Sequence, residues 1–124
     1  IPEVDLGIPL AWGGIPRLVR EIGPALTKEL VLTCRPFGAD EAKSIGFINQ
    51  VVPPGDLETT VTELAENLAS KTLYSLHSTK QQVNAVMEEI AGTGRSAGDA
   101  DMLVYAMRDP ESREATARYL AQRK

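Results

Sequence analysis

The feature that most constrains this 124-residue chain is its surplus of helical segments over strands. Residues 55–124 follow helical spacing almost throughout, whereas residues 1–52 are rich in glycine and proline and mix short elements. Only an extended segment at 2–10 and a short strand at 47–52 are predicted as candidate strands. Buried strands need partners, because unpaired backbone groups are costly away from water. We therefore expect these strands to pair with another chain or with a segment outside this sequence.

Short helices are predicted in the first half of the chain. One spans 14–22 and ends at Gly23, and Pro24 opens the next helix, where its missing N–H is no loss. Another spans 39–45 and is closed by Gly46, a residue type favoured just after a helix end.

Longer helices are predicted after Pro53-Pro54, the first of them capped by Asp56. Its apolar positions recur at spacings of 4, 3 and 4, which place them on one face: Leu57, Val61, Leu64 and Leu68. A helix at 73–91 has candidate buried positions at Leu76, Lys80, Val83, Val86, Met87 and Ile90. Ser96 and Asp99 then predict a capping box, and Asp109-Pro110-Glu111 predicts the start of the last helix.

Composition excludes several classes of function. A net charge of −4 argues against nucleic acid or an anionic membrane as the main partner, because both reward a basic face. No apolar run approaches the roughly 20 residues that span a bilayer. The single cysteine, Cys34, excludes an internal disulfide framework and fits a reducing, cytoplasmic location. The chain opens Ile1-Pro2-Glu3 without Met or a basic leader, so we expect a processed, cleaved or truncated start.

Few residues are candidates for chemistry. Glycine-rich nucleotide motifs are absent, and one His and one Cys cannot form a zinc site, so no metal is predicted. Structural roles are favoured for His77 and Cys34. Glu3 lies beside proline and apolar residues just before a glycine-rich loop, and such surroundings suit a carboxylate to proton transfer. Composition alone favours the simpler alternative that Glu3 is a surface residue at a strand end.

The residues around Glu3 belong to a longer pattern. Pro2-Glu3-Val4-Asp5-Leu6-Gly7-Ile8, followed by Gly13-Gly14-Ile15-Pro16-Arg17-Leu18, resembles the P-E-[VI]-x-L-G-[IL]-x-P-x-x-G-G-x-x-R-L run of the crotonase superfamily of enoyl-CoA hydratases and isomerases. Residues 22–33 and 39–53 resemble the segments that follow it, and Lys80 matches a family lysine. Arg113-Glu114, Tyr119-Leu120 and Arg123-Lys124 resemble the closing segment, so the resemblance covers the chain in order.

The resemblance implies a crotonase-like α/β fold, of which this chain is the mostly helical C-terminal part with one or two short strands. Residues 1–52 would end the crotonase core and carry the loop of the catalytic glutamate. Residues 53–124 would form a helical trimerisation region. Homotrimers or dimers of trimers are the expected assemblies.

The resemblance also implies that the protein adds water across the Cα=Cβ bond of a trans-2-enoyl-CoA, with Glu3 as the catalytic residue that transfers the Cα proton. The family's oxyanion hole and first glutamate precede the matched run, so activity would require an N-terminal half of the same protein. Ala11, Trp12 and Tyr119 are the expected substrate-binding residues. No cofactor is expected beyond the coenzyme A of the acyl-CoA substrate.

Two alternative functions remain open: a Δ3,Δ2-enoyl-CoA isomerase with Glu3 as its sole base, and a non-catalytic acyl-CoA-binding or assembly module. Dienoyl-CoA isomerases carry an Asp where this chain has Ala11, which counts against their chemistry. Tyr119 could equally pack in the core. Gln122 replaces a family lysine that meets CoA phosphate, for which Arg123 or Lys124 could substitute.

Overall fold

The computed structural model describes residues 1–122, apart from the side chain of residue 95. Arg123 and Lys124, the expected substitutes for the phosphate-binding lysine, lie outside the described residues. The helices in chain order are α1 (Gly14–Thr33), α2 (Ala39–Ser44), α3 (Leu57–Ala69), α4 (Leu73–Ile90), α5 (Asp99–Arg108) and α6 (Pro110–Ala121), with 3₁₀ turns η1 (Pro54–Asp56) and η2 (Thr93–Ser96).

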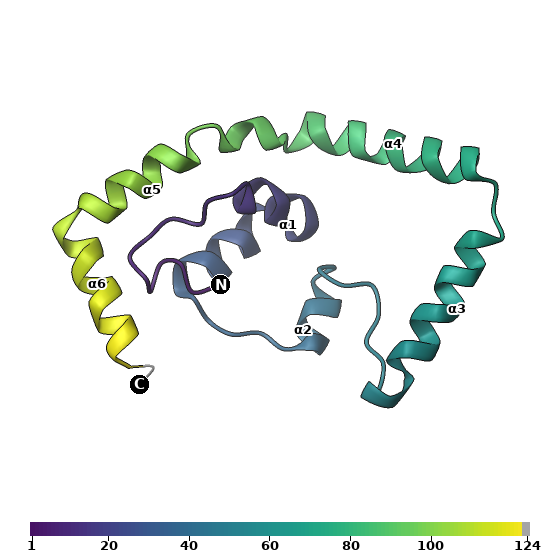
Figure 1. Ribbon diagram of the computed structural model, residues 1–124, viewed down its shortest axis with the longest axis horizontal. Helices are drawn as coiled ribbons and strands as arrows, with labels where there is room; N and C mark the ends of the chain where they lie inside the picture. The colour runs from purple at the N-terminus through teal and green to yellow at the C-terminus, as the bar shows by residue number, and fades with distance from the viewer. Residues whose placement is uncertain (123–124) are drawn as a thin grey trace.

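The helices form an open arc rather than closed layers. Helices α3, α4, α5 and α6 follow one another around the outside, and α1, α2 and the N-terminal loop lie within their curve (Figure 1). The N-terminal loop lies beside α5 and α6, so the two ends of the described chain are on the same side of the arc. Among residues 1–122, every helix is too short or too polar to cross a bilayer.

The two helices predicted around Gly23 are confirmed, although they run together as α1. Gly23 has φ 75° and ψ 167°, a conformation that only glycine adopts readily, and Pro24 follows it. The Thr27 hydroxyl donates to the Gly23 carbonyl at 2.7 Å and partly replaces the helical bonding lost at the break. Helix α2 and the positive φ of 81° at Gly46 agree with the predicted helix end.

The predicted strands are wrong: residues 1–122 contain helices, turns and loops but no strand. Residues 2–8 form a closed turn instead of an extended segment, with the Leu6 N–H bonded to the Pro2 carbonyl at 3.0 Å and the Ile8 N–H to the Glu3 carbonyl at 3.0 Å. Residues 47–52 have no neighbouring strand to pair with. A strand exists only as part of a sheet, so local sequence cannot supply one without a partner.

The predicted caps differ in outcome. Asp109 caps α6 as expected, because its side chain accepts the Ser112 N–H at 2.8 Å. The predicted capping box of Ser96 and Asp99 is wrong. The Ser96 hydroxyl donates to the Thr93 carbonyl within η2, and Asp99 accepts the N–H of Gly13 at 2.9 Å. Asp56 precedes α3 but makes no side-chain cap.

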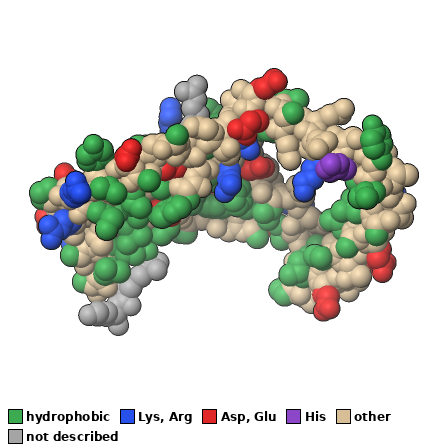
Figure 2. All heavy atoms as spheres, turned by 45° about the horizontal axis from the view of Figure 1, so that its top comes forward, with side chains coloured by type: hydrophobic (Ala, Val, Ile, Leu, Met, Phe, Trp, Pro, Cys, Tyr) green, Lys and Arg blue, Asp and Glu red, His purple; other side chains and the backbone are tan. Residues whose placement is uncertain are grey.

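The buried core is small and lies around α1 and α2. Its side chains are those of Ala11, Pro16, Ile22, Thr27, Leu30, Val31 and Ala42. The apolar residues of α3 expose 48% to 58% of their surface, and none of the predicted positions on α4 is buried. Hydrophobic side chains, drawn in green, are accordingly spread over the face shown in Figure 2. The periodicity identified the apolar faces correctly but not that they would be uncovered.

An ion-pair cluster joins the end of α1 to α2. Arg35 binds both carboxylate oxygens of Glu41, at 2.6 and 3.1 Å, and donates to Glu29 at 2.8 Å. The hydrogen bonds from Arg35 hold the pKa of Glu41 below its ordinary value of 4.5 and raise the pKa of Arg35. The cluster lies beside Phe37, so it fixes the chain that leads to α2.

The Arg35–Glu41 pair should stabilise the protein only above acidic pH. Because the folded-state pKa of Glu41 is lowered, its contribution is present above about pH 4.5 and is lost as the pH falls below that value. We expect Arg35→Gln to lower the Tm slightly at pH 7, less so in high salt, since both partners are in part open to solvent. Melting curves of both proteins should converge at pH 3, and an undiminished difference there would contradict the assignment.

Candidate active site

Glu3 lies in the N-terminal turn with part of its carboxylate shielded from water. Its Oε2 atom is buried, and no hydrogen-bond donor among the described residues reaches it. A buried carboxylate oxygen without a partner is costly, so such atoms in native structures call for an explanation. A group that acts on a bound molecule provides one, because the bound molecule supplies the missing partner.

A cavity of about 470 Å³ opens beside this carboxylate. Its apolar walls come from Ile1, Leu10, Leu18, Phe37 and Phe47, and Gly14, Arg17 and Glu21 complete the lining. Phe37 and Phe47 meet edge to face with ring centroids 6.0 Å apart, a favourable aromatic geometry. Sequence reasoning missed both aromatics, although their positions on either side of the helix predicted at 39–45 placed them close in the chain.

Helix α6 holds the Glu3 turn from its other side. The Thr116 hydroxyl donates to the Leu6 carbonyl, and Gly7 lies directly against the backbone of Ser112. Gly7 has φ +72°, and a Cβ built there would be 2.3 Å from the Ser112 carbonyl oxygen. The backbone of Asp5 also donates to the sulfur of Cys34 at 3.4 Å. The turn is therefore fixed by contacts with α6 and with the end of α1.

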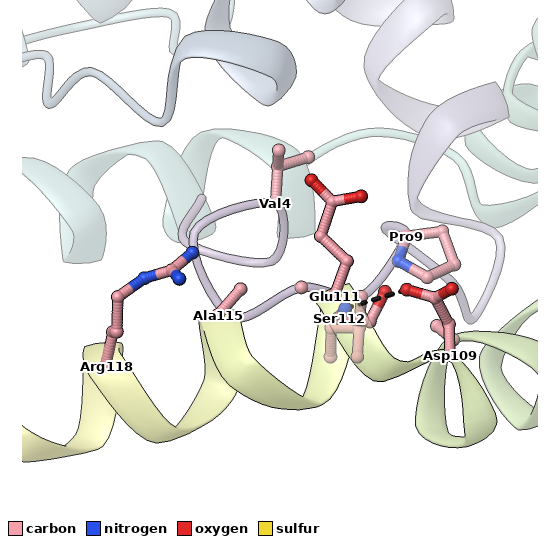
Figure 3. Close-up of a pocket in the computed structure, with 10 residues that line it drawn as sticks. Val4, Pro9, Asp109, Glu111, Ser112, Ala115 and Arg118 are labelled. Carbon is pink, nitrogen blue, oxygen red and sulfur yellow. Dashed lines mark hydrogen bonds between the residues drawn. The ribbon is translucent and has the colours of Figure 1, made fainter.

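The opposite side of the turn borders two further clefts along α6. A cleft of about 410 Å³ lies between Val4 and α6, where Glu111, Ala115 and Arg118 rise toward the turn (Figure 3). Tyr119 and Gln122 line a neighbouring cleft of about 350 Å³. Val4 borders both clefts, whereas Glu3 faces the apolar cavity, so the structure does not bring Tyr119 and Glu3 into one site.

The other predicted site residues lie near the cavity but do not line it. Ala11 is buried in the core, and Trp12 exposes 68% of its surface with φ 57°. Their chain neighbours Leu10 and Gly14 form the cavity wall instead. Ala11, Trp12 and Tyr119 stay predictions as substrate-binding residues.

The remaining candidates are distant from Glu3 or structural. His77 is exposed on α4, and Cys34 is a free thiol that donates to the Val31 carbonyl at 3.6 Å. In the part of the chain that the structure describes, no three His, Cys, Asp or Glu side chains are placed to hold a metal ion. Two carboxylates, the shielded Glu3 and the exposed Glu21, thus border an apolar cavity, and the position of Glu3 suits it to moving a proton on a bound molecule.

A solved structure shares this fold. A crystal structure of a Streptomyces avermitilis protein, provisionally described as an enoyl-CoA hydratase, superposes with a TM-score of 0.84 at 29% sequence identity. The match covers 98% of this chain and 43% of that protein. The sequence predicted a crotonase-like fold, and the structural neighbour has this fold. This chain matches a helical portion of that neighbour.

Curated proteins and a family model agree with the structural match. A crotonyl-CoA hydratase of Syntrophomonas wolfei is 36% identical over 99% of this chain and 47% of its own length. A short-chain-enoyl-CoA hydratase of Clostridium acetobutylicum is 39% identical over 70% of this chain and 33% of its own length. This chain thus spans less than half of either relative. Because the enoyl-CoA hydratase/isomerase family model matches residues 1–124, the chain belongs to that family.

Proposed function

We propose that this chain forms the C-terminal part of an enoyl-CoA hydratase in which Glu3 transfers a proton at Cα. The observation that carries the proposal is the buried, unpartnered Oε2 atom of Glu3 beside an apolar cavity. The hydratase relatives, at 36% and 39% identity, support the reaction class. An acyl chain would fill the cavity and place its Cα against the carboxyl group of Glu3, which would then have a bound molecule as its partner.

The proposed reaction adds the oxygen of water to Cβ of a trans-2-enoyl-CoA. The electrons of the Cα=Cβ bond move toward the thioester, whose oxygen becomes an enolate and needs preorganised donors. The attacking water passes one proton to the group that holds it, and the protonated carboxyl of Glu3 gives its proton to Cα as the enolate collapses. The proton released by the water then restores the carboxyl of Glu3, so that one water is consumed in each turnover. The donors and the group that holds the attacking water are expected in an N-terminal half, as the resemblance to the family implies.

The exposed surface supports the idea that more protein covers this chain. Its accessible surface of 9373 Å² exceeds the roughly 6,500 Å² expected for a compact monomer of 13.4 kDa. The excess is larger than the roughly 800 Å² that each partner buries in a standard interface. We propose the N-terminal half and further copies of the chain, as a trimer or dimer of trimers, as the covering partners.

The same proposal includes the residues that contact the substrate. Ala11 and Trp12 adjoin the cavity wall in sequence, and Tyr119 would meet acyl-CoA from its separate cleft on α6. Coenzyme A enters only as part of the substrate, and no further cofactor is proposed. The free thiol of Cys34 suits a reducing compartment, so we propose the cytoplasm as the location.

The test uses the complete protein that contains this chain. We expect it to hydrate crotonyl-CoA, measured as loss of the enoyl thioester absorbance, and to act weakly on a trans-3-enoyl-CoA. Conversion of only the 3-enoyl substrate would replace the hydratase assignment with the isomerase that uses Glu3 alone. Binding of acyl-CoA without turnover of either substrate would instead favour the non-catalytic module.

A further inference from the structure

A long-range hydrogen bond connects α5 to the loop before α1. The Asp99 carboxylate accepts the backbone N–H of Gly13 at 2.9 Å across 86 positions of sequence, in partly buried surroundings. Asp99 is the first residue of α5, yet its side chain makes no cap for that helix. The carboxylate serves the amino end of α1 instead, where unpaired N–H groups and the helix dipole favour an anion.

The loop that Asp99 binds is conformationally unusual. Trp12 and Gly13 are consecutive left-handed residues, with φ 57° and 71°, and a side chain as large as Trp rarely adopts this conformation. Surrounding structure must therefore impose it. Gly13 is buried against η2, where a Cβ would lie 3.6 Å from the Ser96 hydroxyl oxygen. The Gly14 N–H closes the turn on the Ala11 carbonyl at 3.0 Å, and the bond from Asp99 is the side-chain contact that ties this turn to α5.

The same loop forms one wall of the Glu3 cavity. Leu10 and Gly14, on either side of the left-handed pair, both line it. The wall is tightly packed here, because a Cβ on Gly14 would meet the Leu10 side chain at 2.8 Å. A shift at Gly13 would therefore move Leu10 relative to Glu3.

We propose that Asp99 is a positioning residue that holds the 10–14 loop as the wall of the Glu3 cavity. The proposal rests on the function proposed for Glu3, which it deepens. The helices have other contacts that hold them: Arg20 of α1 binds the Ala91 carbonyl at 2.6 Å and pairs with Glu88 at the end of α4, and α5 packs against α6. Removal of the Asp99 carboxylate should loosen the loop while the helices stay in place.

The test compares Asp99→Ala, Asp99→Asn and Asp101→Ala in the complete protein. Asp101 is a matched control, since it lies in the same first turn of α5, is exposed, and forms no hydrogen bond with any described residue. Hydrogen exchange of the peptide covering residues 10–18, read by mass spectrometry, should quicken at Gly13 by at least about 10-fold in Asp99→Ala, as for loss of a charge-assisted bond. Asp99→Asn keeps an acceptor oxygen and should restore most of the protection.

Activity provides the second readout. For Asp99→Ala, kcat on crotonyl-CoA should fall by about 10-fold or more at an unchanged content of folded protein, because small misplacements of reacting groups are expensive. Asp101→Ala should match wild type. Unchanged exchange at residues 10–18 in Asp99→Ala, or an equal kcat loss in Asp101→Ala, would overturn the proposal. If Asp99→Ala were fully active and Glu3→Gln inactive, only the positioning role of Asp99 would be overturned. If Glu3→Gln were active, the proposed function itself would be overturned.

Discussion

Replacing Glu3 by Gln should lower kcat for hydration of crotonyl-CoA by about 10²–10⁴-fold, the range for loss of a general acid–base group. Gln keeps the shape of the side chain but cannot deliver a proton to Cα. Its amide can still fill the space beside the cavity, so the fold and the KM should change little. The measurement is steady-state kinetics of the complete protein, with circular dichroism to confirm folding.

Asp5→Asn is the control for this variant. Asp5 lies two positions along the same turn and loses the same charge, but its side chain is exposed and lines the Tyr119 cleft rather than the Glu3 cavity. We expect its kcat to match wild type, whatever the effect on KM. If Asp5→Asn lost as much activity as Glu3→Gln, the effect would come from the charge of the turn rather than from proton transfer by Glu3.

Gly7→Ala should destabilise the protein more than any other substitution that adds a single methyl group. The new Cβ would lie 2.3, 2.8 and 2.9 Å from three backbone atoms of Ser112, which cannot rotate away, and φ is +72°. Overpacking and left-handed strain each cost about 1–3 kcal/mol, so we expect a loss of about 2–6 kcal/mol in unfolding free energy. The turn would leave α6 and carry Glu3 with it, so activity should fall too.

Two other glycines separate the causes. Gly46→Ala meets a φ of +81° but only an ordinary contact at 3.7 Å, so it reports the left-handed strain alone. Gly38→Ala meets neither, because its φ is −94° and nothing lies within 4 Å of its Cβ. Urea unfolding should rank the three variants with Gly7→Ala least stable and Gly38→Ala nearest wild type. Equal stability of the Gly7 and Gly46 variants would show that contact with Ser112 is unimportant.

Local signals in the sequence predicted the helices well. Gly23, Gly46 and the Asp109-Pro110 start act within a few residues, and the structure has helix ends or a break at each of them. The strands were wrong because pairing is not local: residues 2–8 satisfy their own backbone groups in a turn, and residues 47–52 lack a partner. The apolar face of α3 was found by its spacing, but spacing cannot show what covers a face.

The site was only partly predictable for the same reason. Glu3 was predicted as the catalytic residue from its motif and stays a prediction, and the structure adds the cavity beside it. The aromatic wall of Phe37 and Phe47 and the bond from Asp99 to Gly13 depend on tertiary contacts. The sequence pattern predicted that Asp99 takes part in a local capping box, because a donor lies nearby in the chain. In the folded chain the Asp99 carboxylate instead accepts the distant N–H of Gly13.

The most direct test of the account is a crystal structure of the complete protein with a slowly reacting acyl-CoA analogue bound. The distance of interest is that from the nearest carboxylate oxygen of Glu3 to Cα of the acyl group. We expect it to be about 3–3.5 Å, within reach for proton transfer, with the acyl chain against Leu10 and Phe47. An acyl group bound elsewhere, with the Glu3 side chain turned into bulk solvent, would contradict the central claim.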